Sequence, residues 1–254
     1  MPDTAPIVKS VRDKVSDAEW DVRVDLAAFY RLVAHYGWDD LTATHISARV
    51  PGEDAFLLNP HGLFFDEITA SSLVKVDYDN NVLLDGGYPI NQAGFTIHSA
   101  VLSGRPDVTC AAHTHTRAGM AVSAMKDGLL PLAQTALRFH NRLSYHDYEG
   151  VALDHSERER LIGHLGKNKA MILRNHGLLT CGESVSETFN VLFYLEKSCQ
   201  LQVDCLGSGR ELHLPDEETC EFTAQQFDKF SPLGKRDWPG LLRKLDRIDP
   251  GFRA

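Results

Sequence analysis

The sequence has no apolar run long enough for a membrane helix and no surplus of basic charge. No stretch approaches the roughly 18 apolar residues of a membrane span, and charges stand where an N-terminal signal would need an apolar core. The 26 Lys and Arg are outnumbered by 35 Asp and Glu, for a net charge of −9. Such a chain has no overall positive field to attract nucleic acid or an anionic membrane. We therefore expect a cytoplasmic protein whose partners are small molecules or other proteins.

The cysteines also lack the arrangement of a disulfide framework or a zinc knuckle. There are five, an odd number, and no two of them form a Cys-x-x-Cys pair. We expect reduced thiols that serve mainly as small packed side chains. Otherwise the composition is that of an ordinary globular protein, with 43% hydrophobic and 24% charged residues over a length of 254, enough to bury a sizeable core.

Neither an internal repeat nor a low-complexity linker interrupts the central part of the chain. We predict an N-terminal arm over residues 1–15, one domain over residues 16–207 and a C-terminal extension over residues 208–254. The extension is rich in glycine, proline and charge, and Trp238 with the following leucines suggests a short docking segment within it.

Helix-start signals and short β-type runs alternate along this domain. Capping-box patterns begin at Ser16, Asp154 and Ser184, and Gly104-Arg105-Pro106 ends another helical stretch. The expected helices cover residues 16–37, 95–103, 154–166 and 184–206, and the expected strands cover 45–50, 56–58, 73–76, 82–84, 108–116 and 170–173. Strands in the middle, with helices before, between and after them, indicate a layered α/β fold.

Three histidines have the placement of metal ligands. Alternate residues of a strand share a face, so His113 and His115 project together while Thr114 points away. His176 ends a second apolar strand, where Gly177 permits a turn and a close backbone approach. Three neutral imidazoles with an open position are typical of a catalytic site for zinc or a similar ion.

The alternative interpretation is that these histidines do not bind a metal. The chain has twelve histidines, so chance pairs occur, and a polar strand face often carries two histidines without a metal. Against this, His113 and His115 lie in an otherwise apolar strand, where unpaired imidazoles would each cost about 1–3 kcal/mol of desolvation.

Over roughly residues 20–207 the chain resembles the class II aldolase and adducin family. The resemblance rests on the segments Asn91 to His98, Arg105-Pro106-Asp107, His113-Thr114-His115-Thr116, Tyr145-His146-Asp147-Tyr148 and Arg174-Asn175-His176-Gly177-Leu178. It implies a three-layer α/β/α sandwich around a largely antiparallel sheet, and a homotetramer with sites near subunit interfaces. It also implies one divalent metal ion on the three histidines. We expect Zn²⁺, with Mn²⁺, Fe²⁺ and Co²⁺ as alternatives.

The departures from the family pattern concern the substrate. Sugar-phosphate aldolases of the family carry an acid–base glutamate where this chain has Gly94, and a phosphate-binding Gly-Asn where it has Thr44-His45. The loop of Asn59 and His61 keeps only the shape of the remaining phosphate contact. The Gly94 version of the segment is closer to adducin heads, which do not keep the metal triad. The chain thus resembles a metal-bearing bacterial member of the adducin-like branch.

The predicted function is a metal-dependent carbon–carbon lyase acting on a small, non-phosphorylated hydroxy- or oxo-carboxylate or carbonyl compound. Without the glutamate, decarboxylation is favoured over aldol cleavage, because CO₂ leaves without a base. Tyr145 and His146, or His61, are the candidate proton donors, although the aromatic turn could simply pack on the sheet. Asn59, His61 and Arg138 are the candidate substrate contacts, and Arg138 could instead form a surface salt bridge.

Two alternatives stay open. One is a non-catalytic, adducin-like oligomerisation module of the kind that binds the actin cytoskeleton, against which the retained triad argues. The other is an oxygenase that uses iron in the same triad, and only the bound metal would separate it from a lyase.

Overall fold

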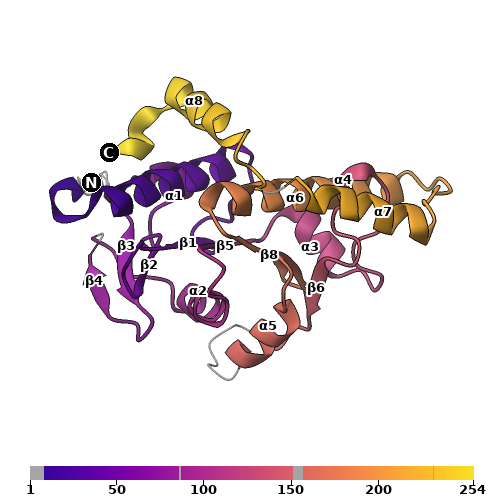
Figure 1. The fold of residues 1–254 in the computed structure, drawn as a ribbon, viewed down its shortest axis with the longest axis horizontal. Helices are drawn as coiled ribbons and strands as arrows, with labels where there is room; N and C mark the ends of the chain where they lie inside the picture. Colours follow the sequence, from indigo (N-terminus) through magenta and orange to yellow (C-terminus); the bar gives the residue numbers. More distant parts are fainter. Residues whose placement is uncertain (1–8, 86, 151–156, 231) are drawn as a thin grey trace.

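The computed structural model describes residues 9–85, 87–150, 157–230 and 232–254, and in these residues eight strands form one sheet (Figure 1). The strand order is β4-β3-β2-β1-β5-β8-β7-β6. Neighbouring strands pair antiparallel except β6 and β7, which run parallel. The strands are β1 His45–Arg49, β2 Ala55–Leu58, β3 Val74–Asp77, β4 Val82–Leu84, β5 Cys110–Thr114, β6 Leu143–His146, β7 Ala170–Leu173 and β8 Gly177–Gly182.

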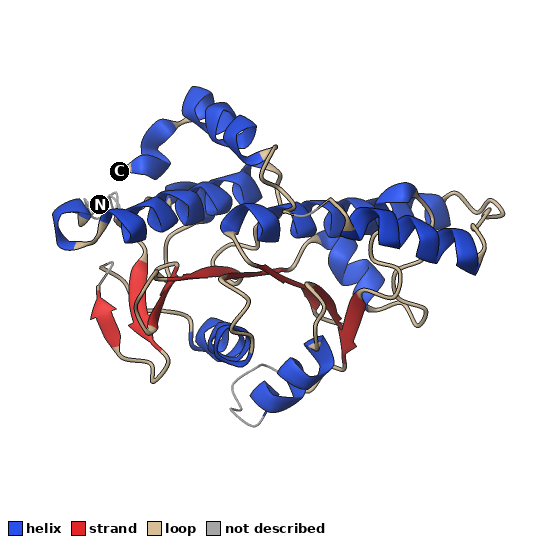
Figure 2. Cartoon of the chain, in the orientation of Figure 1, coloured by secondary structure: helices blue, strands red, loops and turns tan. Residues whose placement is uncertain are grey.

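Helices cover both faces of this sheet, which confirms the α/β/α sandwich (Figure 2). On one face lie α2 and α5, and on the other lie α1 and α6 with the shorter α3 and α4 and the later α7. The helices are α1 Asp17–His35, α2 Gln92–Gly104, α3 Arg117–Ser123, α4 Gln134–Leu137, α5 Glu157–Leu165, α6 Val185–Gly207, α7 Glu217–Asp228 and α8 Trp238–Ile248.

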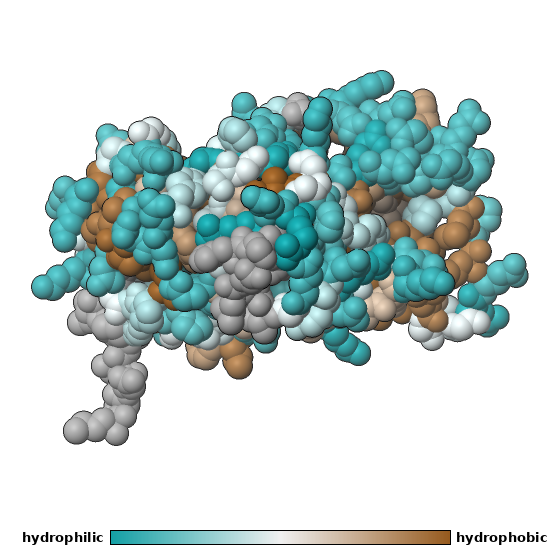
Figure 3. Space-filling model, turned by 90° about the horizontal axis from the view of Figure 1, so that it is seen from below, coloured by the Kyte–Doolittle hydropathy of each residue, from teal (hydrophilic) through white to brown (hydrophobic). Residues whose placement is uncertain are grey.

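The alternation of side chains along the strands builds a separate apolar core on each face. In β5, Cys110 and Ala112 belong to the core under α1 and α6, whereas Ala111 belongs to the core under α2 and α5. His113 therefore points to the α2 and α5 face. Seen from that side, the surface is largely hydrophilic, with hydrophobic patches toward both ends (Figure 3).

The capping signals in the sequence predicted helix starts correctly. Ser16 accepts a hydrogen bond from the amide of Glu19 at the start of α1, and Ser184 accepts one from Glu187 at the start of α6. The helix predicted over residues 95–103 begins earlier, at Gln92, because Asn91 caps it. The start predicted at residues 154–156 lies outside the described residues.

The strand predicted over residues 108–116 is shorter than expected. It ends at Thr114, because the hydroxyl of Thr116 accepts a hydrogen bond from the amide of Gly119 and so begins α3. His115 therefore lies just beyond the strand rather than within it. All five cysteines are free thiols, as predicted.

The last part of the chain contains helices α7 and α8 and returns to α1 (Figure 1). Trp238 is buried and its indole nitrogen donates to Asp25 of α1 at 2.9 Å. Phe252 is fully buried, and its carbonyl accepts a hydrogen bond from the amide of Ala70. This segment thus contributes side chains to the core of the sheet domain. In the described part of the chain, no helix combines the length and apolarity that crossing a membrane requires.

Candidate metal centre

The three predicted histidines converge on one point at the end of β5. The Nε2 atoms of His113 and His115 are 2.9 Å apart, and one ring nitrogen from each of His113, His115 and His176 lies within 4.8 Å of the others. The ring centroid of His176 lies 4.6 Å from that of His113 and 4.9 Å from that of His115.

The β7–β8 hairpin brings His176 to the other two. Asn175 has a φ of 55°, a left-handed conformation that asparagine tolerates in tight turns. Gly177 then begins β8, and a Cβ there would lie 2.4 Å from the carbonyl oxygen of Thr114. Only glycine allows β8 to approach β5 this closely, as the sequence predicted for this position.

Two of the imidazoles are oriented through their other ring nitrogen. Nδ1 of His113 lies 2.9 Å from the carbonyl oxygen of Leu178, and Nδ1 of His115 lies 2.9 Å from a carboxylate oxygen of Asp40. Each Nδ1 donates its proton to that oxygen, so each Nε2 presents a lone pair toward the other two rings. Such carbonyl and carboxylate partners are the usual supports of metal-binding histidines.

His113 and His176 are held in the neutral form that a metal ligand requires. Burial, followed by the neighbouring His45, His176 and His115, holds the pKa of His113 well below its usual range. Burial, followed by His115 and His146, lowers the pKa of His176 to about 4. Lone pairs that face each other at the 2.9 Å between His113 and His115 repel unless a cation lies between them, so the donor set fits a divalent ion.

A cavity of about 670 Å³ opens in front of these rings. Its walls come from the loop before β1, the start of α2, the end of β5 and the segment after β6. Three protein ligands leave a coordination position for a water or a substrate, as in catalytic rather than structural zinc sites. The residues that line it include Thr42, His45, His61, Asn91, Gln92, His113, His115, Met120, Tyr148 and His176.

A fourth histidine, His45, lines the same cavity and was not predicted from the sequence as a site residue. It pairs directly with His113 across β1 and β5, and the two ring centroids are 5.1 Å apart. Its Nδ1 lies 2.8 Å from Nε2 of His98 in α2, and Nδ1 of His98 contacts the hydroxyl of Ser47. Each ring nitrogen of His98 therefore has a partner.

Gly94 lies against the ring of His45. A Cβ at position 94 would lie 2.6 Å from Cδ2 and 2.8 Å from Cγ of His45, much closer than side-chain atoms approach. The imidazole of His45 therefore occupies the room into which a side chain at position 94 would extend. A histidine at position 45 in this conformation therefore requires a glycine at position 94, and an acid–base side chain cannot be accommodated there.

Of the other predicted contacts near the site, only His61 lines the cavity. Its side chain is exposed at the cavity edge. Asn59 is buried instead, and its side-chain oxygen accepts a hydrogen bond from Tyr30 at 2.9 Å. Asn59 thus supports the core beneath the loop and is not among the residues that line the cavity.

The two predicted proton donors point in opposite directions from β6. Tyr145 packs against the core under α1 and α6, its hydroxyl accepts from the amide of Leu129 at 3.0 Å, and it does not reach the cavity. His146 points to the α5 face, where its Nδ1 lies 2.8 Å from Nδ1 of His164. The aromatic residue of this segment that does line the cavity is Tyr148, whose ring centroid lies 6.3 Å from that of His176.

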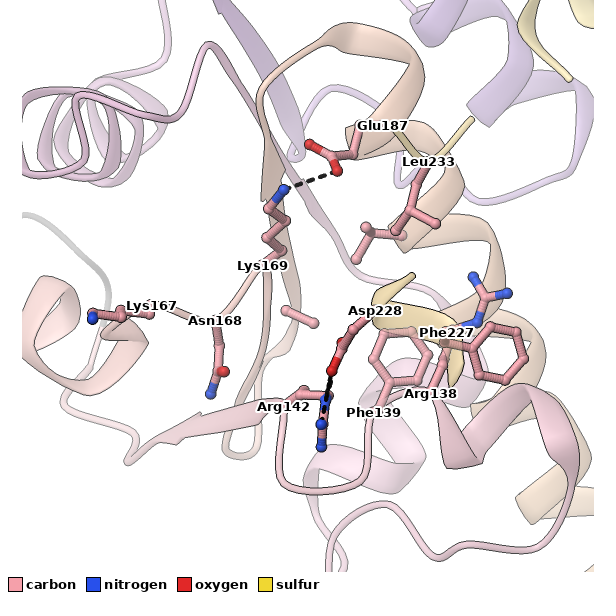
Figure 4. Close-up of a pocket in the computed structure, with 12 residues that line it drawn as sticks. Arg138, Phe139, Arg142, Lys167, Asn168, Lys169, Glu187, Phe227, Asp228 and Leu233 are labelled. Carbon is pink, nitrogen blue, oxygen red and sulfur yellow. Dashed lines mark hydrogen bonds and ion pairs between the residues drawn. The ribbon is translucent and has the colours of Figure 1, made fainter. Parts of the chain in front are cut away.

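Arg138 is not brought to the histidines. It follows α4 and lines pockets beside α6 and α7, where its guanidinium lies near Phe227 (Figure 4). Sequence reasoning could not place it, because the position depends on how α7 returns over α4, and α7 was not predicted. Arg138 is not among the residues that line the cavity at the three histidines, and it forms no salt bridge with a described residue.

Comparison with known proteins identifies related chains. The model of the class II aldolase and adducin N-terminal domain matches residues 24–203. A Pseudomonas aeruginosa protein whose name places it with the class 2 aldolases is 54% identical, with 96% of each chain covered. Alpha-adducin of Rattus norvegicus is 41% identical. The match covers 92% of this chain and 34% of the adducin.

Solved structures agree with this assignment. An aldolase II superfamily protein from Pseudomonas syringae superposes with a TM-score of 0.91 at 50% identity. The superposition covers 97% of this chain and 100% of that one. An L-fuculose 1-phosphate aldolase from Glaciozyma antarctica superposes with a TM-score of 0.83 at 26% identity, covering 99% of this chain and 97% of that one.

Proposed function

The chain belongs to the class II aldolase and adducin family, and from that premise we propose that it is a divalent-metal-dependent carbon–carbon lyase. Its substrate would be a small, non-phosphorylated hydroxy- or oxo-carboxylate or carbonyl compound. The observation that carries the proposal is the convergence of His113, His115 and His176 at the wall of an open cavity. We further propose that the protein acts as a homotetramer in the cytoplasm, as the family membership favours.

His113, His115 and His176 would hold the ion, for which Zn²⁺ is the first choice because three imidazoles and an open position suit it. When bound, the ion supplies Lewis acidity that draws electrons toward a coordinated oxygen. Asp40 and the carbonyl of Leu178 keep two of the rings in the tautomer that faces the ion.

The proton chemistry favours decarboxylation over aldol cleavage. Aldol cleavage requires a base that removes the proton of the substrate hydroxyl, and Gly94 offers none. Decarboxylation starts with the departure of CO₂ and requires only that a proton be returned to the carbon left behind. Substrates of this kind include hydroxylated aromatic acids.

His45 is the residue that we propose to supply this proton, in place of Tyr145 and His146. It is buried, lines the cavity and lies directly across from the ligand His113. Burial, followed by the neighbouring His98, holds the pKa of His45 well below its usual range, so the ring is neutral. With Nδ1 accepting from Nε2 of His98, the one proton of this neutral ring lies on Nε2, from which it can be given to a substrate. His98 and Ser47 fix the ring from behind.

A second candidate function is a non-catalytic, adducin-like oligomerisation module. The 41% identity to alpha-adducin favours it. It makes no use of the histidine cluster, so it predicts that loss of the ligands leaves every property of the protein except metal content unchanged. An iron oxygenase on the same triad would be recognised by iron as the bound ion and by consumption of O₂.

The proposal is tested by incubating the zinc-loaded protein with a panel of hydroxy-aromatic acids and of aldols, followed for CO₂ or aldehyde release. We expect CO₂ release from one class of hydroxy acid, lost in His113→Ala and retained in His35→Ala, which changes an exposed histidine outside the cavity. If the metal-loaded protein turns over neither class, the lyase assignment is wrong.

A further inference from the structure

A second cavity, of about 470 Å³, lies beside α6 and the loop between α7 and α8, on the opposite face of the sheet from the histidines. Four cations line it: Arg138, Lys229, Lys235 and Arg236. Within the described part of the chain, none of the four forms an ion pair, although acidic residues outnumber basic ones in the sequence. The one carboxylate that lines the cavity is Asp237.

Arg138 is the fixed member of this group. Its guanidinium carbon lies 3.6 Å from the ring centroid of Tyr194 and 4.6 Å from that of Phe227. Nη1 donates to the side-chain oxygen of Asn190 at 3.3 Å, whereas Nε is buried and has no hydrogen-bond partner among the described residues. A charged group withdrawn from water without a counter-charge is unfavourable, so the site gains stability when an anion binds beside it.

The neighbouring pocket contains cations that are paired with carboxylates (Figure 4). It shares Arg138, Phe227 and Leu233 with the cationic cavity and contains three more cations, which are Arg142, Lys167 and Lys169. Arg142 pairs with Asp228 at 2.8 Å, and Lys169 pairs with Glu187 at 2.9 Å. Two of these three cations thus have carboxylate partners, whereas the exposed Lys167 and the four cations at the other cavity form no ion pair among the described residues.

The loop that carries Lys235 and Arg236 is anchored on both sides of these two residues, at Gly234 and at Trp238. Gly234 has a φ of 75°, and a Cβ there would lie 2.1 Å from the carbonyl oxygen of Ser186, so the loop approaches α6 as only glycine allows. Four residues later, Trp238 donates to Asp25 at 2.9 Å. The cations thus face the cavity on an anchored segment.

We propose that this cavity binds a small molecule that carries phosphate groups. Four cations against one carboxylate favour a ligand with two or more negative charges, and Arg and Lys together are the usual partners of phosphate oxygens. The rings of Tyr194, Phe227 and Phe230 offer apolar contact to the organic part of such a ligand. This site is separate from the metal centre and independent of the lyase proposal.

Inorganic pyrophosphate is the probe, with binding to the full chain measured by titration calorimetry at low salt. We expect Lys235→Gln/Arg236→Gln to weaken binding about tenfold or more, which corresponds to about 1.4 kcal/mol. The matched control is Lys126→Gln/Arg210→Gln, which removes two exposed cations outside the cavity and should leave the affinity unchanged.

Two further variants locate the binding. Arg138→Gln should also weaken it, with thermal unfolding followed to establish that the variant is folded. His113→Ala should leave it unchanged, because a phosphate that binds to a metal would lose its site in that variant. Absence of binding at millimolar pyrophosphate, equal losses in the cavity and control variants, or loss in His113→Ala would each overturn the proposal, as would a cavity-dependent binding seen only with an oligonucleotide.

Discussion

The side chain of His45 requires a glycine at position 94, because its ring fills the space that a side chain there would occupy. The ring of His45 lies where a Cβ at position 94 would be, at 2.6 Å from the nearest ring carbon. We therefore expect Gly94→Glu to destabilise the protein by about 1–3 kcal/mol through overpacking, and not simply to install a base. Urea unfolding would measure this.

The control for that change is Gly163→Glu, a helical glycine with open space around its Cβ position. It should leave the stability unchanged or raise it slightly, because glutamate is a better helix former than glycine. The double variant Gly94→Glu/His45→Gly should recover most of the lost stability. A Gly94→Glu protein as stable as Gly163→Glu would contradict the exchange.

His98 makes the metal-free protein sensitive to acid. Burial, followed by the neighbouring His113, lowers the pKa of His98 from 6.5 to about 3. The unfolded chain takes up this proton near pH 6.5 and the folded protein does not, so stability falls as the pH drops from 6.5 toward 3. At pH 5 this group alone should cost about 2 kcal/mol relative to pH 8.

Urea unfolding of the EDTA-treated protein at pH 8 and pH 5 tests this effect. His98→Gln should reduce the pH dependence by about 2 kcal/mol. His213→Gln, at an exposed position, should leave it unchanged. His45, His113 and His176, whose pKa values are also lowered, contribute to the remaining slope. A His98→Gln variant with the wild-type slope would show that His98 does not titrate in this way.

The sequence allowed prediction of the histidine cluster but not of the residues that surround it. The spacing of His113 and His115 and the Asn175-His176-Gly177 turn are local signals, and the structure brings all three histidines together. Asp40, His45 and Tyr148 reach the site through pairing of β1 with β5 and through loops. Register between strands distant in sequence leaves no local signal, so these residues were not predicted.

At the scale of elements, capping chemistry was the reliable guide. The first helix and α6 begin at the residues that the capping boxes indicated, because a serine side chain satisfies a free amide there. β6 and β8 were not predicted, since β6 is half-polar and β8 is a short apolar run that begins and ends at a glycine. α7 and α8 lie in a segment whose glycine, proline and charge favoured an irregular extension.

The C-terminal segment is predicted to contribute to the stability of the sheet domain. Phe252 is 0% exposed and packs in the core that α1 and α6 share. We expect Phe252→Ala to lower the free energy of unfolding by about 3–5 kcal/mol, by loss of buried area and creation of a cavity. Chemical unfolding in urea provides the measurement.

Phe230→Ala is the matched control, because the side chain of Phe230 is 64% exposed. It should change stability by no more than about 0.5 kcal/mol. If Phe252→Ala were equally mild, the segment after α7 would be an appendage rather than part of the folded core.

At the scale of the whole molecule, the α/β/α architecture followed from the order of predicted helices and strands together with the family resemblance. The strand order, in which β5 lies between β1 and β8, could not be predicted from local patterns. That order places ligands and supports from three strands side by side. The cationic cavity lies on the other face of the sheet.

The proposed homotetramer is a property of this scale. In light scattering after gel filtration we expect a mass about four times the 28.3 kDa of the chain. The result should not depend on bound metal, because the ligands all come from one chain. A monomer at micromolar concentration would contradict the assembly while leaving the metal centre in place.

The central claim is that His113, His115 and His176 hold a divalent ion, and metal content per chain tests it most directly. Mass spectrometry of the purified protein, after reconstitution with zinc, manganese or iron and removal of excess ion, should give about one ion per chain. His113→Ala should bind essentially none, whereas His35→Ala should match the wild type. Wild-type protein that stays metal-free under all three conditions, or His113→Ala protein that binds as much as the wild type, would contradict the account.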